Sequence, residues 1–428
     1  MSEDRRGYFN NLLLHFRPAE LPERTLRLSL TWALGGAATV LLFVLFGTGL
    51  LLKFVFEPFP DRAYDSILHL QEQVPFGQLI RNLHRWSGNL LVLAAFLHML
   101  RVFYTGAIDS SRRMNWLIGM ALAAGALLSN FTGYLLPWDQ IAYWAITISS
   151  SMLDYLPGIG AALKGWVLGG PEPGAATLMN FYVLHTAVLP ALLIFVLPFH
   201  FWRIRKAHGL VVPRAPEEPP GSHGQMVAAM PHLIVREVAA TLLLLAALLL
   251  FSMVVNAPLT DPANPGLSPN PTKAPWYFMG LQELLLHLHP AFSVFVVPAV
   301  LLAFVLLLPW LTPDNNQAGV WFASRRGRLL TLVSALVAVA LTVGAVWVDE
   351  ALRHAAAVGP GWLERGLLPL AVVAAGGAGY FALLKRAFDA SRAESIQALF
   401  TLMIFALIAL TVIGVWFRGA GMQLGWAG

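Results

Sequence analysis

The sequence predicts an all-α, polytopic membrane protein. Of its 428 residues, 57% are hydrophobic and only 12% are charged, whereas charged residues make up about 25% of an ordinary soluble protein. Several apolar runs exceed the ~18 residues that indicate a membrane-spanning helix. Four such runs precede a segment rich in proline, glycine and charge, and five follow it. We therefore expect a four-helix bundle followed by about five further transmembrane helices.

The order of the spans also predicts the domain organisation. We expect the nine spanning helices at 31–54, 83–104, 115–135, 179–203, 236–256, 291–311, 328–348, 367–386 and 396–417. The linker composition of the segment after the fourth span marks the best boundary. The predicted regions are a four-helix module at 1–208, a linker at 209–231, a three-helix module at 232–348 and two additional helices at 349–428.

The basic residues predict an orientation in the membrane. The first 27 residues are polar and basic, without the short apolar core and cleavage site of a signal peptide. A cytoplasmic N-terminus places 19 of the 28 Lys and Arg residues in cytoplasmic segments and 9 on the other side, as the positive-inside rule favours. The net charge of +5 reflects these loops and is not a sign of nucleic-acid binding.

Two predicted helices each carry a pair of histidines. His84 and His98 are fourteen residues apart, which gives about 21 Å of rise and a rotation about 40° short of whole turns. His185 and His200 are fifteen apart, about 22.5 Å and about 60° past whole turns. The two imidazoles of each helix therefore leave the same side, one near each membrane surface.

These histidines favour a role in binding redox-active metal. A lone intramembrane histidine can simply hydrogen-bond to a neighbouring helix, but polar groups in a membrane are costly and usually functional. Imidazole suits haem iron, so four histidines in two pairs predict two non-covalent haem b groups with bis-histidine ligation. We expect His84 and His185 to hold the outer haem iron, and His98 and His200 the inner one. The absence of cysteine rules out haem attached by thioether bonds and clusters held by this chain.

Glycines and arginines near the same depths support this interpretation. Gly35 with Gly49 on the first helix, and Gly119 with Gly133 on the third, repeat the fourteen-residue interval. They would leave room for flat macrocycles, and ordinary packing of small residues is the alternative. Arg85 and Arg101 each lie within one turn of a histidine. They could pair with haem propionates or extend to lipid headgroups.

Three stretches resemble cytochrome b of the cytochrome bc complexes. They are Phe76–Arg81 with His84–Trp86, then Tyr134–Gln140, then Asn180–Lys206. The fifteen-residue interval is similar to the cytochrome bf branch of oxygenic photosynthesis and its relatives in menaquinone-using bacteria. The resemblance is strong over 28–210, moderate to about 348 and weak beyond. It implies a multi-pass subunit of a quinol-oxidising, proton-translocating complex in a bacterial inner (cytoplasmic) membrane, with both parts fused in one chain.

The resemblance implies a quinol-oxidising site on the outer side. One quinol electron would pass to a Rieske iron–sulfur partner and the other to the outer haem, and the inner haem would reduce quinone at a cytoplasmic site. The implied partners are a Rieske protein, a c-type cytochrome or equivalent acceptor, the quinone pool (menaquinone being one candidate) and membrane lipid, in a homodimer of the complex. The outer-site residues are Tyr134, Pro137, Trp138, Asp139, Trp276 and Tyr277, although interfacial anchoring is the alternative for the tryptophans.

Three features depart from the family pattern. The family's Pro-Glu-Trp-Tyr is replaced by Ala274–Tyr277, so a proton-accepting carboxylate is missing. Glu283, seven residues after Trp276, or Asp139 could replace it, given a suitable pKa. Ala33 stands where the bf branch has a cysteine, which rules out a covalent third haem and leaves a non-covalent one open. The bf-branch chain is split near the linker and has seven helices in total, about two fewer than here.

The cytoplasmic quinone site has fewer sequence signals. His208, Arg236 and Glu237 are candidates, and Arg236–Glu237 resembles a Lys-Asp pair of the family. Basic residues extending to headgroups, with an acid favoured by a helix N-terminus, explain these residues equally well. Two other function classes stay open: a haem-b membrane anchor of a dehydrogenase with one quinone site, and a haem-free transporter or channel. The Tyr134–Gln140 stretch and the Trp276 loop argue against the anchor.

Overall fold

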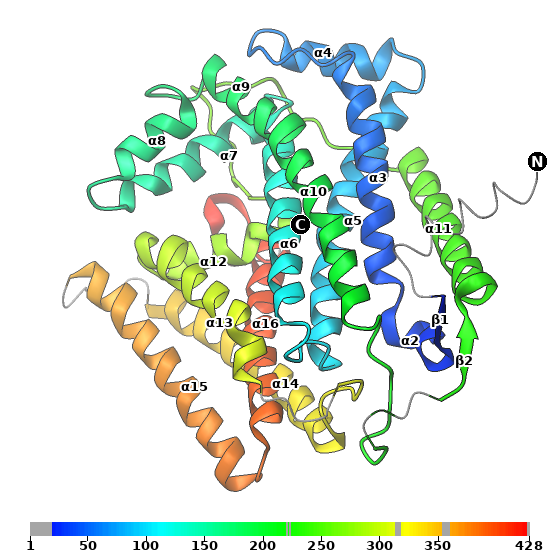
Figure 1. The fold of residues 1–428 in the computed structure, drawn as a ribbon. Helices are drawn as coiled ribbons and strands as arrows, with labels where there is room; N and C mark the ends of the chain where they lie inside the picture. Colours follow the sequence, from blue (N-terminus) through cyan, green and yellow to red (C-terminus); the bar gives the residue numbers. More distant parts are fainter. Residues whose placement is uncertain (1–18, 220, 222–223, 313–317, 353–359, 426–428) are drawn as a thin grey trace, which may run out of the picture. The chain divides into compact units, whose positions relative to one another are not determined.

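The computed structural model describes residues 19–219, 221, 224–312, 318–352 and 360–425, and these residues are mostly helical (Figure 1). Within them, nine helical segments are long and apolar enough to cross a membrane. This confirms the all-α, polytopic class and the predicted number of spans. The nine are Leu34–Lys53, Gly77–Tyr104, Arg113–Leu135, Ala175–Lys206, Ala229–Val254, Phe292–Leu311, Arg325–Leu352, Leu363–Ala387 and Arg392–Trp416.

Most elements of the described chain are helices, and two short strands accompany them. The α-helices are α2 (Leu28–Thr31), α3 (Leu34–Lys53), α4 (Ala63–Glu72), α5 (Gly77–Tyr104), α6 (Arg113–Leu135), α7 (Gln140–Ser151), α8 (Gly160–Leu168), α9 (Ala175–Val183), α10 (Leu189–Lys206), α11 (Ala229–Val254), α12 (Met279–His287), α13 (Val297–Leu311), α14 (Arg325–Leu352), α15 (Leu368–Ala387) and α16 (Arg392–Trp416). Shorter 3-10 turns are η1 (Glu23–Leu26), η2 (Met152–Tyr155), η4 (Trp276–Phe278) and η7 (Ala420–Met422). Strands β1 (Glu20–Pro22) and β2 (Met226–Ala228) pair antiparallel, with Glu20 opposite Ala228.

Three spans contain a π-helical turn that ends two residues before a proline. These turns are η3 (Leu184–Val188), η5 (Phe292–Val296) and η6 (Leu363–Leu367), and each is followed by a helix with proline in its first turn. Proline lacks a backbone N–H and its ring clashes with the carbonyl four residues earlier. A π-turn accommodates this clash without breaking the span.

The chain forms two compact units, which we describe separately. Unit 1 comprises Met1–Trp138, Leu178–Thr260 and Asp314–Trp321, and unit 2 comprises Asp139–Thr177, Asp261–Pro313 and Phe322–Gly428. The predicted domain boundaries stay a prediction, and positions 220, 222–223 and 353–359 of the expected linker and connecting segments lie outside the described residues.

Unit 1 is built around α5. Helix α3 packs along α5, α6 packs against α5 and α10, and α11 packs against α3 and α5. Each of these five helices contributes one or more buried apolar residues to one core, including Leu41, Leu91, Ala126, Leu193 and Leu248. This core lies between the two ends of α5, where the histidines are placed.

Helix α5 begins six residues before the apolar run from which it was predicted. Its polar first turns are buried against the 255–258 segment. Arg81 donates to Ala257 O at 2.8 Å and to Pro258 O at 2.7 Å, and Trp86 Nε1 donates to Val255 O at 2.8 Å. Because these polar side chains find backbone partners, the helix continues beyond its hydrophobic stretch.

Unit 2 is built around α16. Helices α12, α14 and α15 all pack against it. Its N-terminus is fixed by a capping box, in which Ser391 Oγ accepts from Glu394 N and the Glu394 carboxylate accepts from Ser391 N. The stretch that begins at Gln140 forms α7 and then η2.

Candidate functional site

The four predicted ligands lie on two helical segments of unit 1. His84 and His98 are on α5, His185 is in η3, and His200 is on α10. The rings of His84 and His185 have centroids 6.1 Å apart and an interplanar angle of 79°. This spacing matches two imidazoles that share one ion, each with a metal–nitrogen bond of about 2 Å. His84 and His185 thus lie side by side as a pair. The pairing of His98 with His200, and haem ligation by all four histidines, stay predictions.

Each histidine ring lies against one of the four predicted glycines. The distances from an added Cβ to the Cε1 atom of the facing ring are 3.2 Å for Gly35 and His98, 3.1 Å for Gly49 and His84, 3.4 Å for Gly119 and His200, and 2.5 Å for Gly133 and His185. Glycine at these positions leaves space beside each imidazole, because a side chain there would meet the ring. The prediction that the same glycines make room for macrocycles stays a prediction.

Hydrogen bonds fix two of these rings. Thr48 donates its hydroxyl to Val44 O at 2.7 Å, which leaves its oxygen to accept from His84 Nδ1 at 2.9 Å. His185 Nδ1 lies 2.9 Å from Ser129 O, which can only accept. An imidazole that donates from Nδ1 keeps the Nε2 lone pair for a metal. The donor set therefore fits haem iron.

The number of ligands also fits haem better than a bare ion. Among the described residues, no group of three or more His, Cys, Asp or Glu could hold a metal ion. Structural metal ions held by protein alone usually need about four ligands. Two histidines suffice only when a macrocycle supplies the others, as in haem.

Two arginines on α5, each within one turn of a histidine, have buried guanidinium nitrogens. Arg101 is buried and donates Nε to Leu30 O at 2.7 Å, but its Nη2 has no hydrogen-bond partner among the described residues. The Arg85 guanidinium lies 4.9 Å from the centre of the Tyr134 ring, and its Nε is likewise buried and unsatisfied within the described part. A buried guanidinium N–H favours an anionic acceptor, so both residues fit propionate binding.

A third arginine was missed by the sequence reasoning. Arg203 Nε is buried without a hydrogen-bond partner among the residues that the structure describes. Arg203 follows His200 by three residues on α10, the spacing that places side chains on one face of a helix. The sequence analysis selected Arg85 and Arg101 because each lies within one turn of a histidine. The same criterion would have identified Arg203.

The residues predicted for the inner quinone site have structural contacts of their own. Arg236 Nη1 donates to Leu26 O at 2.8 Å and so ties α11 to the N-terminal segment. His208 lies just beyond α10 with a positive φ of 61°, and Glu237 follows Arg236 on α11. Quinone binding at these three residues stays a prediction.

The residues predicted for the outer site fall in both units. Tyr134, Pro137 and Trp138 belong to unit 1, whereas Asp139 belongs to unit 2. Asp139 is buried and caps α7, because its Oδ1 accepts from Ala142 N at 2.9 Å. This contact gives the carboxylate a structural role at the helix N-terminus.

The next residue, Gln140, organises part of the outer loop. Its backbone N donates to Asp261 O at 2.8 Å, its Nε2 donates to Leu267 O at 2.9 Å, and its Oε1 accepts from Asn264 N at 2.8 Å. The start of α7 thus fixes the proline-rich 261–267 stretch. No local pattern indicated this role, since the partners are more than 120 positions away.

Trp276 and Tyr277 form η4 at the start of α12. Their rings are 5.6 Å apart and nearly perpendicular, at 82°. Gln282 fixes the segment before them, since its Oε1 accepts from Ala274 N at 2.6 Å and its Nε2 donates to Thr272 O at 2.7 Å. The aromatic pair therefore lies between two fixed parts of unit 2.

Glu283, the candidate proton acceptor, is fully buried. Its carboxylate accepts from Arg418 Nη2 at 2.6 Å and lies 3.1 Å from His287 Nε2. Burial alone would raise the pKa of Glu283, but hydrogen bonds from His287 and Arg418 and the charge of Arg418 outweigh it and lower the pKa. A lowered pKa weakens a proton acceptor, so these contacts favour a positioning role for Glu283.

Comparisons with known proteins agree with this arrangement. Residues 22–208 match the family described as Cytochrome b/b6/petB. The chain is 41% identical to cytochrome b6 of Heliomicrobium gestii over 187 residues, which cover 44% of this chain and 88% of that protein. It is 39% identical to cytochrome b6 of Acaryochloris marina over 175 residues, which cover 41% and 81%.

A solved structure shares the fold. It belongs to a "Hyperthermophilic respiratory Complex III", and the alignment covers 96% of this chain and 97% of that chain with a TM-score of 0.68 at 21% identity. The fold similarity extends well beyond the residues matched by the family. Together with the cytochrome b6 relatives, it shows that this integral membrane protein belongs to the cytochrome b family.

Proposed function

We propose that this chain is the dihaem cytochrome b subunit of a quinol-oxidising cytochrome bc-type complex. The observation that carries the proposal is the facing pair of His84 and His185, together with four predicted ligand rings that each lie against a glycine. Imidazoles inside a membrane are costly unless they serve a function. Membership of the cytochrome b family supports haem b as the bound group.

The chain's own residues would orient the ligands and compensate charge. Haem b, when bound, supplies one-electron redox chemistry tuned by its axial ligands. Thr48 and Ser129 hold Nδ1 of two ligands, so that Nε2 is presented to the iron. Arg85, Arg101 and Arg203 offer buried donors to propionates. The fourteen-residue spacing along α5 would separate the two centres by about 21 Å.

Quinol oxidation would take place on the outer side, where Trp276 and Tyr277 offer aromatic faces to a quinone ring. The similarity to a respiratory complex III chain and to cytochrome b6 supports a Rieske protein and a c-type cytochrome or equivalent acceptor as partners. We further propose a homodimeric complex that reduces quinone at an inner site and couples oxidation to proton translocation, as the resemblance of the sequence implies. A dehydrogenase anchor would need no such outer segment.

Redox titration tests the proposal. The complex that contains this chain should show two b-type components in reduced-minus-oxidised spectra. His84→Ala should remove one component and His98→Ala the other, because each variant loses one of two axial ligands. His69→Ala, a histidine of α4 outside the four, serves as the control and should retain both. Spectra without b-type bands, or loss of neither component in the two variants, would refute the dihaem assignment.

A further inference from the structure

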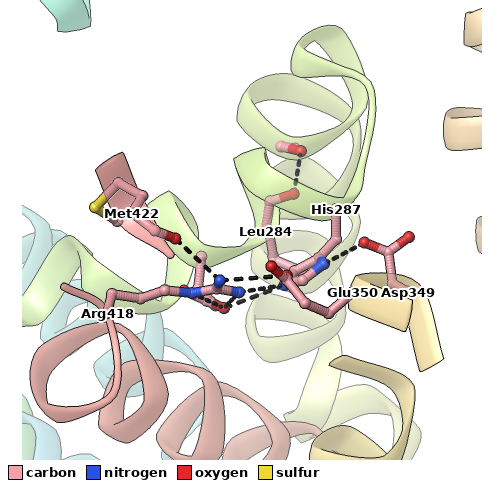
Figure 2. A network of polar contacts seen from close by, with 8 residues as sticks. Leu284, His287, Asp349, Glu350, Arg418 and Met422 are labelled. Atoms are coloured by element: carbon pink, nitrogen blue, oxygen red, sulfur yellow. Dashed lines mark hydrogen bonds and ion pairs between the residues drawn. The ribbon is translucent and has the colours of Figure 1, made fainter. Parts of the chain in front are cut away.

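A buried network in unit 2 contains charged residues that the haem sites do not use (Figure 2). Arg418, just beyond α16, and Glu283 on α12 both have side chains with 0% exposure. Arg418 Nη2 lies 2.6 Å from Glu283 Oε1, and Nε lies 3.0 and 3.1 Å from the two carboxylate oxygens. Buried charges are stable only when they are paired and hydrogen-bonded. Loss of this contact between α12 and the end of α16 would therefore leave an unpaired buried charge and destabilise the protein.

The remaining donors of Arg418 fix the chain around it. Nη1 donates to Glu350 Oε2 at 3.3 Å and to Met422 O at 3.0 Å. The first contact reaches the end of α14, and the second closes the C-terminal turn, in which Arg418 also pairs with Leu424. Arg418 therefore connects α12, α14 and the C-terminal turn through one planar guanidinium.

The same C-terminal turn holds the loop that leads to Trp276. Gly421 N donates to Asn270 Oδ1 at 2.5 Å, and Lys273 Nζ donates to Val415 O at 2.9 Å. Gln282, beside Glu283 on α12, binds the next residues of this loop, Thr272 and Ala274. The loop is thus fixed from α12 and from the end of α16.

Helix α12 lies directly on α16 over this region. A Cβ at Gly280 would be 2.8 Å from Thr411 Oγ1 and 3.0 Å from Leu407 O, and a Cβ at Gly414 would be 2.8 Å from Met279 Cε. Glycine at both positions allows this close approach. The packing leaves little freedom for α12 to shift while Arg418 holds Glu283.

We infer that Arg418 positions the Trp276–Tyr277 segment for quinol through its contact with Glu283, and that this positioning is a role of the last transmembrane helix. The inference rests on the proposed function, in which this segment binds quinol. Arg418 reaches η4 only through Glu283, α12 and the 270–274 loop, so it is a positioning residue. Glu283 is then its anion partner and does not accept the quinol proton.

The test uses the intact complex that contains this chain and a short-chain quinol as the probe. The initial rate of haem b reduction is measured against quinol concentration. We expect Arg418→Gln to raise KM by roughly tenfold, because small displacements of a binding segment are costly, with a smaller change in kcat. Haem content and both midpoint potentials should stay unchanged, since Arg418 contacts none of the four histidines.

Two further variants separate positioning from general damage. Arg418→Lys keeps the charge but loses the planar guanidinium, so it should raise KM less than Arg418→Gln. If the complex with Arg418→Gln does not assemble, the KM of Arg418→Lys tests the positioning role. The double variant Arg418→Gln with Glu283→Gln leaves no unpaired buried charge. The KM of this double variant should lie between those of the parent and Arg418→Gln. Such a partial recovery shows that the two residues are coupled, whereas substitutions at independent sites would have additive effects.

Arg326→Gln is the matched control. Arg326 pairs with Glu394 at 3.1 Å, at the opposite end of α16, and also donates to Phe388 O at 3.2 Å. This change should leave KM unaltered. The inference is overturned by an unchanged KM in both Arg418 variants, or by an equal rise in Arg326→Gln. Absence of b-type bands in the unaltered complex would instead overturn the proposed function.

Discussion

At the residue scale, the space left by a glycine decides where each imidazole lies. Gly133 makes the closest approach, because an added Cβ would be 2.5 Å from His185 Cε1 and 3.0 Å from its Nδ1. Real Cβ atoms do not approach other atoms so closely, so the ring or the helix would have to move. The His185–Ser129 hydrogen bond would then be lost as well.

We expect Gly133→Ala to destabilise the protein by about 1–3 kcal/mol, as overpacking in a core usually does, and to weaken or shift the outer haem component. Gly36→Ala is a suitable comparison, since nothing lies within 4 Å of its added Cβ. That variant should remain within about 0.5 kcal/mol of the parent. Thermal unfolding and redox titration of both variants would measure the difference, and identical behaviour would contradict the glycine–imidazole packing.

At the element scale, α7 depends on its first residues. Asp139 caps the helix and Gln140 binds the 261–267 stretch. Helix N-termini carry unsatisfied N–H groups, and a carboxylate oxygen satisfies one of them. The same carboxylate was a candidate proton acceptor, so the two roles need to be separated.

Two substitutions at Asp139 separate them. Asp139→Ala should cost about 0.5–2 kcal/mol through loss of the cap, seen as faster amide exchange in α7. Asp139→Asn keeps a capping oxygen but removes the ionisable group, so exchange in α7 should stay slow. If Asp139→Asn also retains quinol oxidation, the residue acts as a cap. Loss of that activity with a protected helix would assign it to proton transfer.

At the scale of the whole molecule, the buried network predicts how stability depends on pH. His287 Nδ1 lies 2.7 Å from Asp349 Oδ2, and Nε2 lies 3.1 Å from Glu283 Oε1 and 3.3 Å from Arg418 Nη2. Burial would lower the pKa of His287, but the hydrogen bonds and charges of Glu283 and Asp349 outweigh it and raise the pKa. Glu350 adds a third carboxylate to the network, on the other side of Arg418.

The pKa shifts of Glu283 and His287 affect stability at opposite ends of the pH range. The lowered pKa of Glu283 contributes stability above its ordinary value of 4.5, and this is lost as pH falls through the folded pKa. The raised pKa of His287 contributes stability below 6.5, and this is lost as pH rises through the folded pKa. We expect the melting temperature to fall as pH rises above 6.5 and through the raised pKa of His287, and we expect this fall to be reduced in His287→Gln. An unchanged alkaline limb in that variant would contradict the prediction.

The membrane orientation is a second prediction at this scale. The chain has no cysteine, so single introduced cysteines can be labelled without background. Ser111 and Ser268 are exposed residues in loops that the charge distribution places on opposite sides. Ser268→Cys should react with an impermeant maleimide from the outer side, and Ser111→Cys only after the membrane is opened. The reverse pattern would invert the proposed orientation.

Composition and periodicity were enough to predict the membrane class, the nine spans found among the described residues, and the pairing of His84 with His185. Those features depend on apolar length and on helical periodicity, which are local properties of a chain. The interval also identified the four glycines, but it could not say which imidazole each glycine lies against. That pairing follows from how the helices pack.

Tertiary structure alone decided the contacts that join distant parts of the chain. Arg418 meets Glu283 across 135 positions, and Gln140 meets Asn264 across 124. No periodicity links such residues, because their meeting depends on how α12 packs on α16 and how the outer loop returns to α7. A buried charge also constrains the role of its partner. In the sequence, Glu283 is a candidate proton acceptor, whereas in the structure it is the buried counter-ion of Arg418, just beyond the last helix.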